Sequence, residues 1–168
     1  MKRFFVKILS SCGFLGYIPV ASGTFGTVAG VAMVWLVYLL LGVCGWSVTD
    51  WQWRIVYVCI TIFLVWVSVP ISTAAEVLYR EKDSSKIVID EAVSFFITMF
   101  LLPFSLKIVV VGFLLNRVFD IIKPQPARYC QDRMSAGLGV MMDDVVSAVY
   151  SNVVLRIIIL LTGNFFFS

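Results

Sequence analysis

Five carboxylates stand in short polar stretches that separate long apolar runs. They are Asp90, Glu91, Asp120, Asp143 and Asp144. Crowded carboxylates repel one another unless a cation joins them, and Mg²⁺ prefers oxygen ligands of this kind. The alternative is helix capping, which explains one acid of each adjacent pair and leaves the other without a role. The glycines at 137 and 139 precede the last pair, which we expect to open the final apolar helix.

Two basic residues accompany Asp120 in the stretch 116–126. Arg117 lies three positions before Asp120 and Lys123 three positions after it, so a helix would bring these side chains near one another. Cations held at such a site bind phosphate oxygens and offset charge that grows in a transition state. The alternative is an Arg117–Asp120 surface ion pair followed by a proline stop.

A glycine-rich segment, 16–27, directly precedes the first long apolar run. Its candidate phosphate ligands are Gly23, Thr24, Gly26 and Thr27. Glycine allows close backbone approach, and the following helix offers free N–H groups and a positive dipole end. The segment is not a Walker A loop, since the lysine of that motif is absent. A plain turn that enters a membrane helix is the alternative.

The elements that must position these residues are membrane helices. Hydrophobic residues make up 61% of the 168 residues and charged residues 14%, whereas soluble domains average about 25% charged. The runs 28–45, 55–75 and 145–162 are each long enough to cross a hydrocarbon core of about 30 Å. Arg156, in the last run, would snorkel to the interface. A soluble helical protein with a large oligomeric interface is the alternative.

The stretch 92–116 is apolar but interrupted by Pro103, Ser105 and Lys107. Proline disfavours a continuous helix, so two short helices joined near 102–107 are expected, as a re-entrant hairpin or as two short spans. The fold class is therefore all-α: a polytopic membrane bundle of about three full spans plus a proline-broken hairpin, in one domain over 1–168.

The charges favour one orientation in the bilayer. All 13 basic residues except Arg54, Lys107 and Arg156 lie in the segments 1–27, 76–91 and 117–144. The fold above places these segments on one face, which the positive-inside rule makes cytoplasmic. The same face carries all ten acids except Asp50. The apolar stretch after Lys2 and Arg3 is interrupted by Lys7 and is too short for a signal peptide, so the N-terminal segment is expected to be retained.

Other site chemistries are excluded by composition. The chain has no histidine, which excludes Ser-His-Asp triads, histidine nucleophiles and His-ligated zinc. The four cysteines form no CxxC pair and read as small core residues. A net charge of +3 without interleaved aromatics indicates no nucleic-acid partner; the sequence identifies no protein partner either.

At four places the sequence resembles the bacterial phosphatidylglycerophosphatase A family. The matching positions are Gly16, Pro19, Gly23, Thr24 and Gly26; Asp90 and Glu91; Arg117, Asp120, Lys123, Pro124 and Pro126; and Gly137, Gly139, Met141, Asp143 and Asp144. Ser22, Thr27 and Ala136 replace the family's usual proline, serine and glycine. These are small residues, and every acid of the matched motifs is kept.

The resemblance implies an all-helical, Mg²⁺-dependent lipid phosphatase that converts phosphatidylglycerophosphate to phosphatidylglycerol at the cytoplasmic leaflet of a bacterial inner membrane. The five acids would hold Mg²⁺ directly or through water, and the metal would bridge the terminal phosphate and position a water. Arg117 and Lys123 would bind phosphate oxygens; one aspartate acting as covalent nucleophile or general base stays open. The rival functions are a small cation transporter or channel with a carboxylate-lined path, and a structural subunit.

Overall fold

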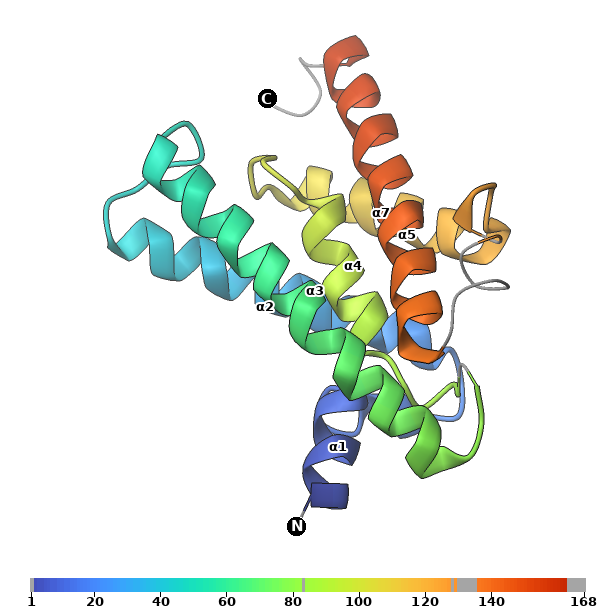
Figure 1. Cartoon of the computed structure of the whole chain (residues 1–168). Helices are drawn as coiled ribbons and strands as arrows, with labels where there is room; N and C mark the ends of the chain where they lie inside the picture. Colours follow the sequence, from blue (N-terminus) through green and yellow to red (C-terminus); the bar gives the residue numbers. More distant parts are fainter. Residues whose placement is uncertain (1, 83, 128, 130–135, 163–168) are drawn as a thin grey trace.

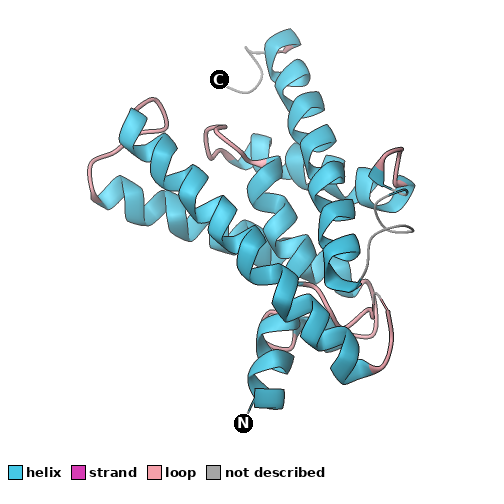
Figure 2. Ribbon diagram, in the orientation of Figure 1, coloured by secondary structure: helices cyan, strands magenta, loops and turns pink. Residues whose placement is uncertain are grey.

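The computed structural model describes residues 2–82, 84–127, 129 and 136–162, and within them it contains helices and no strands (Figure 2). The elements in chain order are α1 (Lys2–Ser10), a 3-10 turn η1 (Leu15–Tyr17), α2 (Ser22–Val43), α3 (Trp51–Tyr79), α4 (Ile89–Thr98), α5 (Leu106–Ile122) and α7 (Ala136–Leu161). The all-α prediction is confirmed for the described part of the chain.

In the described part of the chain, three helices are long and apolar enough to cross a membrane: α2, α3 and the part of α7 from Met141 to Leu161. Their outward faces carry large exposed apolar side chains, such as Trp66 at 72% exposure, because lipid takes the place of water around them. The three predicted spans are confirmed. However, α2, α3 and α7 each begin earlier than the runs 28–45, 55–75 and 145–162 indicated.

The proline-broken hairpin is confirmed as α4 and α5. The chain between them has Leu101 in the left-handed region at φ 54°, and the Ser105 side chain caps α5 by accepting from Ile108 N at 3.3 Å. The 10 residues of α4 rise only about 15 Å, half of a hydrocarbon core. This helix contacts α2, α3, α5 and α7 and forms the centre of the bundle (Figure 1).

Tyrosines from two spanning helices satisfy carbonyls where α4 ends. Tyr57 of α3 donates to Phe96 O at 2.9 Å, and Tyr38 of α2 donates to Leu102 O. Backbone carbonyls released at a helix end inside a bilayer find no water there. These hydroxyls therefore allow a short helix to stop at membrane depth.

Arg156 serves the same hairpin tip, so the expectation that it snorkels outward was wrong. Its Nη2 donates to Phe100 O at 2.6 Å, and its Nε donates to Asn152 Oδ1 at 2.9 Å. Asn152 Nδ2 in turn donates to Thr98 O at 2.9 Å and to Phe100 O. A charge inside a span is stabilised when it points into the bundle and finds such acceptors.

The described cysteines are free thiols, but they are not the core residues that the sequence predicted. Cys44 and Cys59 are exposed on the outer surface of the bundle, and Cys12 is half-buried. Apolar residues around a membrane helix face lipid as readily as core, so a cysteine in an apolar run is not necessarily inside. Cys130 lies outside the described residues.

The polar segments gather at one end of the bundle. Figure 1 shows the starts of α2, α4 and α7 and the ends of α3 and α5 close together, away from the α2–α3 and α4–α5 loops. The bundle therefore places the motif-bearing stretches side by side. Arg128 and Arg133, two of the basic residues assigned to this face, lie outside the described residues.

Candidate active site

Asp90 and Glu91 occupy the first turn of α4, as the sequence predicted. The N-cap residue Val88 provides no side-chain cap. Asp90 is 3% exposed, and its Oδ1 accepts a hydrogen bond from Glu91 N at 3.1 Å. The positive end of the helix favours both acids at this position.

Asp143 and Asp144 lie inside α7 and do not open it, so the prediction of a helix start at this pair was wrong. The helix begins at Ala136, about two turns earlier. Both side chains are nevertheless buried, at 2% and 6% exposure. Because capping applies only at a helix end, it explains neither aspartate.

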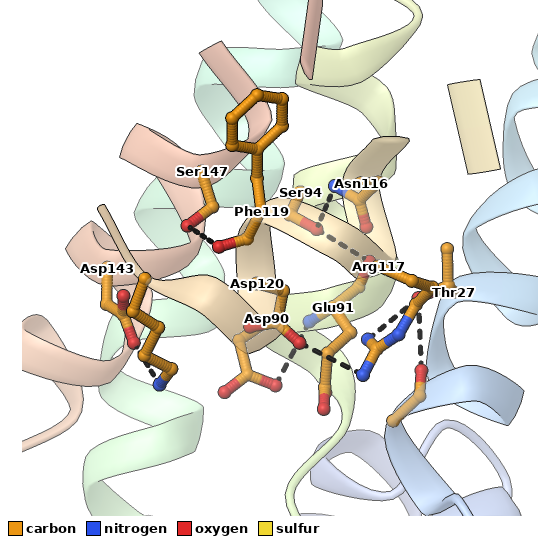
Figure 3. A network of polar contacts seen from close by, with 12 residues as sticks. Thr27, Asp90, Glu91, Ser94, Asn116, Arg117, Phe119, Asp120, Asp143 and Ser147 are labelled. Atoms are coloured by element: carbon orange, nitrogen blue, oxygen red, sulfur yellow. Dashed lines mark hydrogen bonds and ion pairs between the residues drawn. The ribbon is translucent and has the colours of Figure 1, made fainter. Parts of the chain in front are cut away.

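Carboxylate oxygens from two helices converge at this end of the bundle. One oxygen each of Asp90, Glu91 and Asp144 lies within 4.8 Å of the other two. A cavity of about 240 Å³ adjoins them, lined by Asp90, Glu91, Asp120, Ile121, Lys123, Asp143 and Asp144. Figure 3 shows Asp90, Glu91 and Asp120 together, with Asp143 on the adjacent helix. All five predicted acids are thus brought together.

Burial raises the pKa of Glu91 to about 8. A hydrogen bond with Asp90 opposes this rise, and the negative charges of Asp144 and Asp120 add to it. Part of the Glu91 side chain is exposed, but its Oε2 is buried and has no hydrogen-bond partner among the described residues. A buried acceptor without a donor is costly, and a cation would satisfy it.

Arg117 bridges two helices beside this cluster. Its Nη2 pairs with Asp120 Oδ2 at 3.0 Å, as the spacing predicted, and its Nη1 donates to Thr27 Oγ1 of α2 at 3.2 Å. Thr27 itself donates to Gly23 O at 3.0 Å, so its hydroxyl proton is already engaged. The guanidinium is therefore held in one direction (Figure 3).

Lys123 ends α5 in the left-handed conformation, at φ 47°. Its Nζ contacts Asp143 Oδ2 at 2.5 Å, which brings a positive charge from α5 to the acids of α7. An ammonium next to a buried aspartate offsets a charge that would otherwise be costly. Both predicted cations thus lie at the cluster, but Arg117 does not line the cavity.

The sequence placed the glycine-rich segment 16–27 before the first long helix, but its end is already helical. Residues 23–27 form the first turns of α2, with Ala21 as N-cap. A β-carbon at Gly26 would lie 2.8 Å from Val88 Cβ, and one at Gly30 would lie 2.5 Å from Ala92 O. Small residues on this face allow α2 to pack closely against α4, while Thr24 is half-buried.

A buried amide behind the acids was not assigned a role from the sequence. Asn116 is 1% exposed, and its Nδ2 donates to Thr98 Oγ1 at 2.9 Å and to Ser94 Oγ at 3.3 Å. It fixes α5 against α4 one residue before Arg117. The sequence feature that could have indicated this contact is the i, i+4 spacing of Ser94 and Thr98, which places two hydroxyl groups on one face of an apolar helix.

Similarity to known proteins extends over most of the chain. The profile of the family described as phosphatidylglycerophosphatase A matches residues 8–159. A Bacteroides thetaiotaomicron protein, provisionally named a phosphatidylinositol-3-phosphatase, is 32% identical across 94% of this chain and 96% of its own. No solved structure matches.

Two further relatives bear the family's name. The Haemophilus influenzae phosphatidylglycerophosphatase A is 33% identical, over 83% of this chain and 79% of its own. The Escherichia coli phosphatidylglycerophosphatase A is 28% identical, over 81% of this chain and 73% of its own. Given the family match over residues 8–159 and these relatives, the chain belongs to the phosphatidylglycerophosphatase A family of phosphoric monoester hydrolases.

Proposed function

We propose that this protein removes the terminal phosphate of phosphatidylglycerophosphate, releasing phosphatidylglycerol and phosphate, with Mg²⁺ held at the carboxylate cluster. The observation that carries the proposal is the convergence of Asp90, Glu91 and Asp144 within 4.8 Å. Arg117 and Lys123 flank this cluster. Carboxylates for a cation beside fixed positive charges are what phosphoryl transfer requires.

The donor set fits magnesium. All the candidate ligands are carboxylate oxygens, which hard divalent cations prefer. Glu91 Oε2 is buried without a hydrogen-bond partner among the described residues, as expected for a ligand. Asp90, Glu91 and Asp144 are assigned as the main ligands, while Asp120 and Asp143 hold the two cations and contribute to the site from there.

When bound, Mg²⁺ would supply charge neutralisation at the phosphate and lower the pKa of a coordinated water. The chain's own contribution is orientation. Thr27 and Asp120 hold the Arg117 guanidinium from two sides, which fixes a planar fork suited to phosphate oxygens. Lys123 adds a point charge at the cavity. Cations fixed before the reaction stabilise developing charge without reorganisation.

The position of the site suits a lipid substrate. The cavity lies at the end of helices long and apolar enough to span a membrane, so the head group of a lipid in the adjacent leaflet can reach it while its chains stay in the bilayer. The basic segments at this end support the cytoplasmic face of the inner membrane. A cation transporter or channel would instead need acidic side chains along the length of the bundle. The acidic residues that the structure describes gather at this end, apart from Asp50.

Two head groups compete as substrates. The Bacteroides thetaiotaomicron relative is named for phosphatidylinositol 3-phosphate, and both lipids carry a phosphate monoester on a polyol. The family profile over residues 8–159 and the names of the other two relatives support phosphatidylglycerophosphate.

The test is phosphate release in detergent micelles from each lipid, with Mg²⁺ and with EDTA. The proposal expects release from phosphatidylglycerophosphate that requires Mg²⁺ and exceeds release from phosphatidylinositol 3-phosphate. Faster release from the inositol lipid would overturn the substrate assignment. Equal rates in EDTA and Mg²⁺ would overturn the metal assignment.

A further inference from the structure

A second polar hollow lies between α1 and the C-terminal end of α3. This arginine groove has a volume of about 450 Å³ and is lined by Arg3, Val6, Ala74, Val77, Leu78 and Arg80. It shares no residue with the carboxylate cavity.

The groove has two guanidinium groups from different elements. Arg3 belongs to α1, and Arg80 is the residue that ends α3, in the left-handed conformation at φ 57°. Both are exposed, and neither forms an ion pair with a described residue. Glu81, the next residue after Arg80, is not among the lining residues, and its carboxylate accepts from Ser84 Oγ at 2.7 Å. The guanidinium donors therefore remain available to an anion.

The floor of the groove is apolar. Val77 is 76% exposed, and Val6, Ala74 and Leu78 lie beside it. Val6 belongs to α1. Ala74, Val77 and Leu78 occupy the last turns of α3, a helix long and apolar enough to span a membrane, so the floor adjoins the boundary between hydrocarbon and head groups. A small inorganic anion would leave this apolar surface in water, whereas a lipid would cover it.

The adjoining helix has the character of an interfacial segment. Phe4 and Phe5 of α1 are 58% and 59% exposed, next to Arg3 in the sequence. Exposed aromatic side chains with basic neighbours on one short helix are typical of elements that lie at a membrane surface. The helix on this side of the groove thus has exposed apolar surface that a membrane would cover.

We propose that the arginine groove binds one anionic phospholipid, with its phosphate between Arg3 and Arg80 and its glycerol and first methylenes on Val6, Ala74 and Val77. Arginine suits this task because its planar fork matches phosphate oxygens, which lysine does not reproduce. The bound lipid would join α1 to the end of α3. This site is independent of the phosphatase activity proposed above.

The experiment measures binding of short-chain phosphatidylglycerol and phosphatidylcholine to the detergent-solubilised full chain by native mass spectrometry. It is performed in EDTA, where the carboxylate cavity repels an anionic head group. The variants are Arg3→Ala, Arg80→Ala, their combination, and the combined Arg3→Lys and Arg80→Lys pair. Arg54→Ala is the matched control, because it removes one charge from the other end of the same helix.

We expect one phosphatidylglycerol to bind in preference to phosphatidylcholine. Each alanine substitution should weaken binding about five-fold and the pair about 25-fold, with the lysine pair in between and Arg54→Ala unchanged. Equal binding of both lipids, or wild-type affinity in the double-alanine variant, would overturn the proposal. Displacement of the lipid by an equal concentration of inorganic phosphate would also overturn it, since the site would then be one for free phosphate.

Discussion

Gly23 lies directly against the carboxylate of Glu91. A β-carbon added at Gly23 would stand 2.5 Å from Glu91 Oε1 and 2.9 Å from Arg117 Nη2. The absence of a side chain at this position therefore allows an acid of α4 and a cation of α5 both to approach the start of α2 closely. Gly23 thus affects the site through the positions of Glu91 and Arg117.

Gly23→Ala should therefore reduce catalysis more than stability. The added methyl group displaces Glu91 and Arg117, and misplacement of catalytic groups by about 1 Å costs on the order of 100-fold in rate. Gly42→Ala is the control, because no atom of the described residues lies within 4 Å of a β-carbon there; it should keep full activity. The measurement is kcat/KM for phosphate release, with thermal unfolding alongside. Equal activity in the two variants would contradict this role of Gly23.

Glu91→Gln should stabilise the metal-free protein increasingly as pH rises. The folded pKa of about 8 lies above the ordinary value of 4.5, so the wild type loses stability as pH increases from about 5 through 8. Glutamine does not ionise, and the variant should avoid this loss, with a difference on the order of a few kcal/mol at pH 8. Thermal unfolding in EDTA at pH 5 and pH 8 measures it. A difference between variant and wild type that is the same at both pH values would refute the burial effect.

Arg156→Leu should destabilise the fold without reaching the carboxylates. It removes the bonds from Nη2 to Phe100 O and from Nε to Asn152 Oδ1, and leaves Phe100 O with the 3.2 Å bond from Asn152 Nδ2. Hydrogen bonds from a charged donor contribute about 1.5–3 kcal/mol. Arg54→Leu is the comparison, because its guanidinium donates to Val48 O at an exposed position and should cost about 0.5 kcal/mol or less. Unfolding in detergent measures the loss of stability in both variants. Equal losses would show that the fold does not depend on the Arg156 donor to Phe100 O.

The membrane helices and the broken hairpin could be predicted because apolar length and Pro103 are local properties of the chain. The starts of α2 and α7 could not. Glycines near 23 and 137 favour turns locally, but packing between helices overrides that preference and extends both helices into the motifs. For this reason Asp143 and Asp144 are found inside a helix.

The proximity of the candidate acids and cations could be predicted, while their pairing could not. The Arg117–Asp120 contact follows from helical spacing within α5. Thr27 as the second partner of Arg117, and Asp143 as the partner of Lys123, depend on how α2 and α7 pack against α5. Such contacts between distant segments have no signature in a single sequence. The inward direction of Arg156 was missed for the same reason.

The most direct test of the carboxylate site is phosphate release from phosphatidylglycerophosphate by Asp144→Asn in Mg²⁺. Asp50→Asn serves as the control, since Asp50 is the N-cap residue of α3 and accepts a hydrogen bond from Ser47 N. It thus belongs to the α2–α3 loop, which lies away from the carboxylates (Figure 1). We predict that Asp144→Asn folds and releases almost no phosphate, while Asp50→Asn matches the wild type. Full Mg²⁺-dependent release by a folded Asp144→Asn variant would contradict the assignment of the site to these carboxylates.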